Sequence, residues 1–162
     1  GHGLDIARGL GFIVQCDPQL AHRRIQTGVE VDHTLRPQAR NQLLARHQLA
    51  GLRKPTKSPN QLVHGDLYGT VLFAGTAAPG ITDITPYWRP APWAAGVVVV
   101  DALSWGEADD GLIERWDALP EWPQMLLRAL MFRLAVHALH PRSTAEAFPG
   151  LARTAALIRL VL

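Results

Sequence analysis

The chain has 162 residues, of which 48% are hydrophobic and 19% are charged, and its formal net charge is +2. These values are typical of one globular domain with a sizeable core, and they exclude an intrinsically disordered chain. The small net charge argues against nucleic acid as a partner. No hydrophobic run approaches the roughly 20 residues of a membrane span, so no membrane partner is expected.

Cys16 is the only cysteine, which excludes an intrachain disulfide and favours a reducing compartment. We therefore expect a cytoplasmic protein with a single domain over residues 1–162. Within it, residues 1–60 are predicted to form a helical or irregular segment, and residues 61–162 the core.

The first part of the chain is weakly patterned. Residues 5–13 are apolar-periodic but are interrupted by glycines. Residues 35–52 are a better helix, because their leucines recur at helical spacing among polar residues. A polar linker with two prolines follows at 53–60.

The middle of the chain predicts short strands. Residues 61–63 form a strand that leads into a glycine-containing turn, and residues 71–73 and 80–84 are the expected arms of a hairpin. Residues 93–105 contain a run of four valines. Propensity alone predicts a strand there, whereas length and flanking residues fit a buried helix, so both alternatives stay open.

The last third predicts helices. Residues 123–140 give the clearest one, because proline opens the segment, a broad apolar face follows, and Pro141 ends it. Residues 151–162 predict a short amphipathic helix. The expected fold class is therefore α+β and mainly α.

His64, Asp66 and Asp83 are the main candidates for chemistry. His64 and Asp66 flank a glycine on the turn after an apolar strand, and Asp83 ends a later apolar strand. Because a hairpin returns the chain, the two carboxylates are expected to face one pocket. Phosphoryl transfer uses such a pair, in which one carboxylate orients the attacking hydroxyl and the other holds magnesium. For either aspartate alone, a helix cap or an Asx turn is the alternative.

The motifs VHGDL and VLF, followed by PYWRP and VVVVDAL, carry a family resemblance. Together they resemble the catalytic and metal-binding loops of the aminoglycoside phosphotransferase family, and more narrowly an uncharacterised actinobacterial subgroup of it. The resemblance covers about residues 60–140. It implies the C-terminal lobe of a protein-kinase-like fold, with a short β-hairpin region that carries both loops. It also implies transfer of the ATP γ-phosphate to a small-molecule hydroxyl, with Mg²⁺ and ATP as cofactors.

The resemblance assigns a role to four residues. Asp66 is implied as the catalytic aspartate that accepts or orients the substrate hydroxyl, and His64 as the support of the loop backbone. Asp83 is implied as the ligand of the magnesium that bridges the phosphates. Thr70 stands where the family normally has an asparagine, and its neutral hydroxyl is a weaker second ligand for the metal and its nucleotide.

Other residues have open alternatives. Arg89 is a candidate for binding an anionic group or a phosphate, and equally for holding an internal carboxylate such as Asp101. His137 and His140 are three positions apart near a helix end, where they share a metal or, as we favour, interact with the helix dipole. A core role is favoured for all five tryptophans: Trp88, Trp93, Trp105, Trp116 and Trp122.

The chain also departs from the family. No lysine precedes Lys54, and no segment before Gln61 alternates like the sheet of an N-terminal lobe. Three hypotheses follow: a phosphotransferase-like enzyme, a degenerate lobe that acts as a binding or assembly module, or a fragment whose N-lobe is encoded elsewhere or was removed. The second predicts a homodimer or a separate N-lobe partner.

Overall fold

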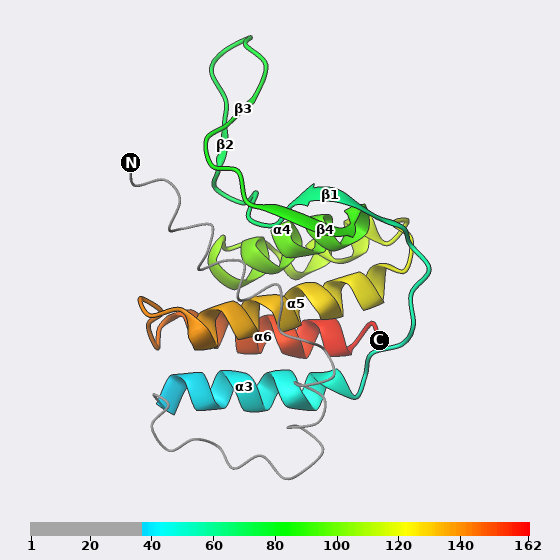
Figure 1. Cartoon of the computed structure of the whole chain (residues 1–162), viewed down its shortest axis with the longest axis vertical. Coiled ribbons are helices and arrows are strands. Elements are labelled where there is room, and N and C mark those ends of the chain that lie inside the picture. The colour runs from blue at the N-terminus through cyan, green and yellow to red at the C-terminus, as the bar shows by residue number, and fades with distance from the viewer. Residues whose placement is uncertain (1–36) are drawn as a thin grey trace. The chain divides into compact units, whose positions relative to one another are not determined.

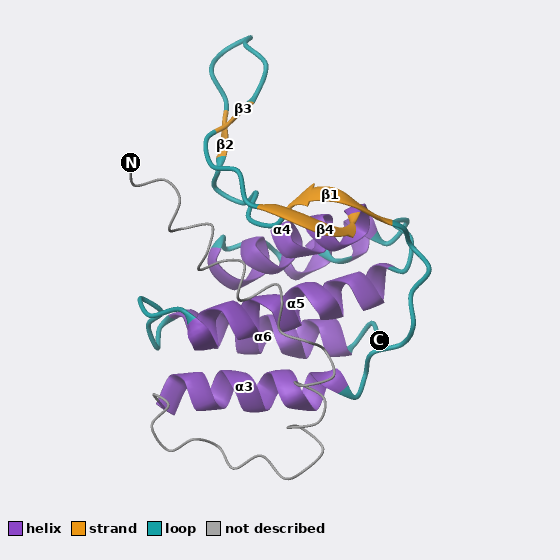
Figure 2. Ribbon diagram, viewed as in Figure 1, coloured by secondary structure: helices purple, strands orange, loops and turns teal. Residues whose placement is uncertain are grey.

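The computed structural model describes residues 37–162, which form four α-helices and four short strands. They are α3 (Pro37–Ala50), β1 (Asn60–His64), β2 (Val71–Leu72), β3 (Gly80–Ile81), β4 (Pro86–Pro90), α4 (Ala91–Trp105), α5 (Trp122–Leu139) and α6 (Ala147–Arg159), with 3-10 turns at Asp110–Leu112 and Glu114–Trp116. This part of the chain is mainly helical with small antiparallel sheets, which confirms the α+β class (Figure 2). The expectations for residues 5–13 and for Cys16 lie outside the described residues.

Helix α5 is the centre of the helical part (Figure 1). It packs against α4, α3 and α6, and α4 also contacts α6. Leucine, valine, methionine and isoleucine side chains from these helices form one buried cluster, including Val97, Val100, Met125, Leu126, Leu130, Leu134, Leu151 and Ile158. None of the described helices is both long and apolar enough to cross a membrane.

The valine run of 97–100 lies in α4, so the helical alternative is correct and the strand alternative is wrong. Val97, Val99 and Val100 are all buried, because α4 has α5 and α6 on one side and contacts β1 and β4 on another. A helix surrounded in this way is apolar on several faces, which removes the periodic signal that distinguishes a helix from a strand.

Two small antiparallel sheets carry the turns of interest. In the first, β1 pairs with β4, and His64 lies opposite Pro86. In the second, β2 and β3 pair over only two residues each, so the predicted hairpin forms with arms shorter than 71–73 and 80–84. This hairpin projects away from the helices (Figure 1). No local sequence pattern predicts β4, which begins and ends with proline.

The linker after α3 is tied to the start of α5. The backbone N–H groups of Lys57 and Ser58 donate to the Glu121 carboxylate at 2.7 and 2.8 Å, and the Ser58 hydroxyl donates at 2.6 Å. These contacts lower the pKa of Glu121, with the Ser58 hydroxyl as the largest cause. Glu121 has a left-handed backbone (φ 56°) just before the helix, an uncommon conformation for a residue other than glycine.

Two of the five tryptophans have the expected core role. Trp93 and Trp122 are buried, and Trp122 donates its indole N–H to the Ile113 carbonyl at 2.8 Å. The other three, Trp88, Trp105 and Trp116, are exposed. The core prediction therefore holds for Trp93 and Trp122 and fails for the other three.

Candidate functional site

A cavity of about 360 Å³ opens beside the turn that follows β1. Three parts of the fold line it. The turn contributes Asp66 and Tyr68, and α4 contributes Asp101 and Trp105. The C-terminal half of α5 and the loop after it contribute a set of polar and basic side chains, including Arg133, His137, His140, Arg142 and Ser143. The cavity is thus lined largely by groups that ionise or form hydrogen bonds.

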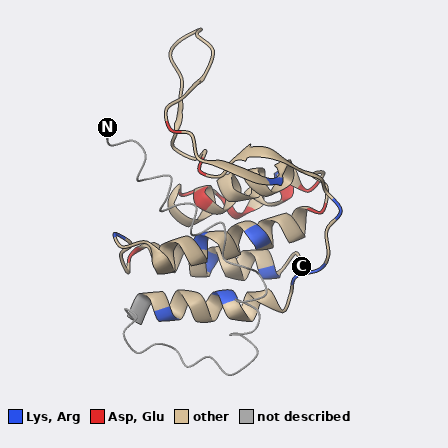
Figure 3. Ribbon diagram, viewed as in Figure 1, with Lys and Arg blue, Asp and Glu red and all other residues tan. Residues whose placement is uncertain are grey.

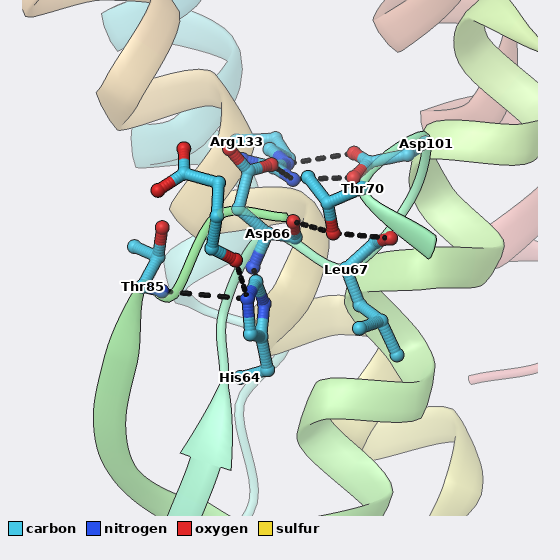
Figure 4. A network of polar contacts seen from close by, with 8 residues as sticks. His64, Asp66, Leu67, Thr70, Thr85, Asp101 and Arg133 are labelled. Atoms are coloured by element: carbon cyan, nitrogen blue, oxygen red, sulfur yellow. Dashed lines mark hydrogen bonds and ion pairs between the residues drawn. The ribbon is translucent and has the colours of Figure 1, made fainter. Parts of the chain in front are cut away.

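Arg133 is the residue that organises one side of this cavity (Figure 4). Its Nε donates to Asp101 Oδ1 at 2.6 Å, and its Nη2 donates to both Asp101 Oδ2 and Asp66 Oδ1, the latter at 2.6 Å. The side chains of Arg133 and Asp101 are 8% and 3% exposed, whereas that of Asp66 is 48% exposed. Asp66 is therefore held at one oxygen while much of its carboxylate remains accessible.

Burial and ion pairing oppose each other in this cluster. Burial alone acts to lower the pKa of Arg133. The opposing effect is larger and raises this pKa, and it comes from the hydrogen bonds to Asp101, the Asp101 charge and the contacts with Asp66. The guanidinium therefore stays charged. For Asp101, burial raises the pKa of the carboxyl, and the contacts with Arg133 offset only part of this rise. The arginine thus remains a fixed cation against which both carboxylates are placed.

His64 fixes the backbone of the turn. Its Nδ1 accepts a hydrogen bond from the Asp66 N–H at 3.1 Å, which leaves the hydrogen of the neutral ring on Nε2. Nε2 lies 2.5 Å from the Asp83 carbonyl oxygen, so it donates to that oxygen. The Gly65 N–H adds a bond to the Thr85 carbonyl at 2.8 Å. The imidazole therefore joins the turn at 64–66 to the segment that follows β3, which is a backbone-supporting position.

Gly65 is required at the centre of this turn. A Cβ at position 65 would lie 2.2 Å from Cδ2 of Tyr87, closer than any real side-chain contact. Tyr87 in turn packs edge-on against Phe132 of α5, with ring centroids 5.3 Å apart. The turn is thus pressed against the aromatic rings that connect β4 to the helical layer.

Thr70 serves the turn rather than the cavity. Its hydroxyl is placed to donate to the carbonyls of Leu67 at 2.9 Å and Asp66 at 3.2 Å. Its own carbonyl accepts from the N–H and the hydroxyl of Thr82. Thr70 therefore links the turn to the hairpin, and it is not among the residues that line the cavity.

Asp83 is placed apart from Asp66. Its carbonyl takes part in the His64 contact, but its side chain is exposed and does not line the cavity. The sequence predicted that the two carboxylates face one pocket. The structure does not bear this out, because only Asp66 lines the cavity. The described residues contain no group of three His, Cys, Asp or Glu side chains suited to a metal ion. The implied ligands of Mg²⁺ are Asp83 and Thr70, and the Thr70 hydroxyl is bonded to the carbonyls of Leu67 and Asp66 instead. These residues therefore do not assemble the implied two-ligand Mg²⁺ site, and we derive no step through Mg²⁺ or ATP.

Arg89 lies on the exposed side of β4. Its Nη1 donates to the carbonyl of its neighbour Trp88 at 3.0 Å, and it does not line the cavity. Asp101, the carboxylate considered as its partner, is bound by Arg133 instead. The structure therefore assigns the internal ion pair to an arginine of α5 rather than to Arg89.

His137 belongs to the cavity wall. Its ring lies against that of Trp105, with centroids 4.7 Å apart, and its Nδ1 is 3.3 Å from the Ser143 hydroxyl. Burial lowers the pKa of His137, and the charges of Arg133 and His140 lower it further, so the ring is neutral at pH 7. The metal-sharing alternative for His137 and His140 finds no third ligand in the described part of the chain.

The sequence reasoning missed Arg133, Trp105 and Ser143 as members of the site. One signal was available for Arg133, since it is a charged residue between apolar neighbours on the face of a helix, and such a residue is buried only when it is paired. Comparison with protein-family models, with curated proteins and with solved structures finds no match for this chain. The inference of function therefore rests on the turn and the cavity.

Proposed function

We propose that the described residues form the acceptor half of a kinase-like phosphotransferase site, in which Asp66 orients the hydroxyl of a small molecule bound in the cavity. One observation carries the proposal. Asp66 stands on a turn held by the His64 contact to the Asp83 carbonyl, and its half-exposed carboxylate lines the cavity. A positioned carboxylate at the mouth of a polar cavity is the arrangement that an attacking hydroxyl requires.

The chemistry of Asp66 follows from its ion pair. Oδ1 is occupied by Arg133, so Oδ2 is the oxygen that accepts a hydrogen bond from the substrate hydroxyl. Arg133 also binds Asp101, and the three side chains together carry one net negative charge when all are ionised. The substrate hydroxyl therefore meets an anionic acceptor that Arg133 already orients.

The phosphoryl donor is the second part of the proposal. The family resemblance implies Mg²⁺ and ATP, and Asp83 is the residue that would meet the metal. Its carboxylate is exposed at the base of the hairpin, so solvent and ligands reach it. Thr70 and Arg89 are assigned no contact with the nucleotide. The Thr70 hydroxyl donates to a carbonyl of the turn, and the Arg89 guanidinium donates to the carbonyl of Trp88.

A different function is favoured by a separate observation. Large apolar side chains are exposed on the β1–β4 sheet and the hairpin: Leu62 (70%), Phe73 (79%), Ile84 (75%) and Trp88 (64%). Leu62 and Trp88 lie opposite each other across the sheet. Large apolar side chains left exposed next to one another, as Leu62 and Trp88 are, are typical of interaction sites. A binding or assembly module, as a homodimer or with a separate N-lobe, is thus the second candidate.

Calorimetry separates the two candidates. Mg²⁺-ATP is titrated at millimolar concentration into the wild type, Asp83→Ala and the control Asp117→Ala, which removes another exposed carboxylate. The phosphotransferase proposal predicts heat that is lost only in Asp83→Ala. Absence of heat with the wild type would rule out autonomous phosphoryl transfer. Light scattering tests the assembly candidate, since a strictly monomeric chain argues against self-association through the apolar surface.

A further inference from the structure

The two ends of the cavity differ in charge. Arg133 and His137 lie in the C-terminal half of α5, and His140 follows as the residue that ends the helix. Because a helix rises 1.5 Å per residue, Arg133 and the last helical residue, Leu139, are separated by about 9 Å along its axis. A ligand that fills the cavity of about 360 Å³ therefore meets the Asp66 cluster at one end and the loop after α5 at the other.

The Asp66 end is acidic. Both aspartates that line the cavity, Asp66 and Asp101, bind the same guanidinium, that of Arg133. Two carboxylates and one guanidinium leave one net negative charge when all are ionised. This charge repels an anionic group and attracts a hydroxyl hydrogen.

The other end is basic. The Arg142 side chain lines the cavity and is exposed, and no carboxylate besides the Arg133-bound pair is among the lining residues. The backbone N–H of Arg142 donates to Nδ1 of His140 at 3.2 Å, which holds the imidazole next to the Arg142 backbone. An exposed arginine in the wall of a cavity is suited to binding an oxyanion.

We propose that the cavity takes a hydroxylated organic anion, whose phosphate or carboxylate binds Arg142 while its hydroxyl meets Asp66. The hydroxyl end of this inference rests on the proposed function, whereas the anion end rests on Arg142 in the cavity wall. A polycationic amino sugar is the wrong ligand for this cavity. Its ammonium groups would face Arg142 at one end, and a single net negative charge is available at the other.

The test uses glycerol 3-phosphate, inorganic phosphate, glycerol and kanamycin as probes at fixed ionic strength. The indole N–H signal of Trp105 reports on the cavity by NMR and is assigned with Trp105→Phe. It is compared with the signal of Trp88, which lies outside the cavity.

We expect glycerol 3-phosphate to shift the Trp105 signal saturably and to bind more tightly than either glycerol or kanamycin. Arg142→Ala should weaken its binding about tenfold or more, since it removes a charge-assisted contact. Arg159→Ala, at an exposed arginine of α6, should not change it.

The outcomes distinguish the two inferences. Kanamycin binding more tightly than glycerol 3-phosphate, or anion binding unchanged in Arg142→Ala, overturns the anion proposal. If phosphate and glycerol 3-phosphate bind equally and Asp66→Asn has no effect, the anion site stands and the acceptor role of Asp66 falls. If glycerol binds through Asp66 while no anion binds, the acceptor role of Asp66 stands and the anion proposal is wrong. If none of the probes shifts the Trp105 signal, both are wrong.

Discussion

Arg133 on α5 binds Asp101 on α4 through two hydrogen bonds, and both side chains are almost fully buried. The same guanidinium reaches out to the half-exposed Asp66 at 2.6 Å. The carboxylate at the cavity mouth is therefore positioned by a cation that the helical layer holds in place. Figure 3 shows basic positions on α3, α5 and α6, and acidic positions on α4, on the segments around it and on the loop between α5 and α6.

Replacing Arg133 with methionine should be strongly destabilising. It leaves the Asp101 carboxylate buried without its partner, and breaking a buried pair in this way costs about 3–5 kcal/mol. Chemical denaturation followed by circular dichroism measures the free energy of unfolding. The double variant Arg133→Met/Asp101→Leu should recover much of the loss, because no unpaired charge remains. A single variant that loses less than about 1 kcal/mol would show that the pair is not buried as described.

Asp66→Asn should have a small effect on stability. Its contact to Arg133 is half exposed, and exposed ion pairs contribute about 0–1 kcal/mol. The same denaturation experiment checks this. A loss as large as that of Arg133→Met would mean that Asp66 is part of the structural cluster, and its role in ligand binding would then need a different test.

Several elements follow from local sequence alone. The helix expected over 123–140 is α5, Trp122–Leu139, because proline at its start and a broad apolar face are local signals. The helix expected over 35–52 is α3, Pro37–Ala50. The one expected over 151–162 is α6, which begins earlier, at Ala147. Residues 61–63 lie within β1.

The remainder depends on contacts that the sequence does not specify. Strand β4 exists because β1 lies beside it, and no local pattern indicates that pairing. Periodicity marks Arg133 as an unusual residue on an apolar face, but it does not say that Asp101 and Asp66 are its partners. The cavity arises from three separate segments, so the sequence marked Asp66, His137 and His140 as candidates but did not indicate that they line one cavity.

Gly150→Ala should destabilise the contact between α6 and α4. A Cβ at position 150 would lie 2.0 Å from the carbonyl oxygen of Ser104, and backbone cannot move aside as a flexible side chain does. We expect a loss of about 1–3 kcal/mol, the range for overpacking, in the free energy of unfolding. Gly51→Ala is the matched control, since nothing lies within 4 Å of its Cβ, and it should change stability by less than about 0.5 kcal/mol. Equal effects of the two substitutions would contradict the close helix approach.

Acidification should destabilise the native chain through His137. Burial and the nearby cations lower the pKa of His137 below its ordinary value of 6.5. The unfolded chain therefore takes up this proton first, so the contribution of His137 is present above pH 6.5 and is lost as the pH falls towards the native pKa. The ring is half-buried, and we expect an effect below about 1 kcal/mol.

Denaturation of the wild type and His137→Phe at pH 7.5 and pH 5.5 measures this effect. Phenylalanine retains a ring beside Trp105 but does not titrate. The wild type should lose more stability than the variant between the two pH values. The comparison also cancels the contribution of Asp101, whose raised pKa acts in the opposite direction in both proteins. Identical losses would show that His137 protonates equally well in the folded chain.

His64→Leu should loosen the turn and the hairpin without unfolding the helices. It removes the acceptor of the Asp66 N–H and the donor to the Asp83 carbonyl. Each lost hydrogen bond costs about 0.5–1.5 kcal/mol, so amides of the turn should exchange with solvent about tenfold faster. Hydrogen exchange measures this at Asp66 and Gly65, with His47→Leu on the exposed side of α3 as the control.

If Asp66 is the acceptor for the substrate hydroxyl, glycerol 3-phosphate should also bind less tightly to His64→Leu, because the carboxylate is then poorly positioned. Faster exchange with unchanged binding would separate the support of the turn from the function of the cavity.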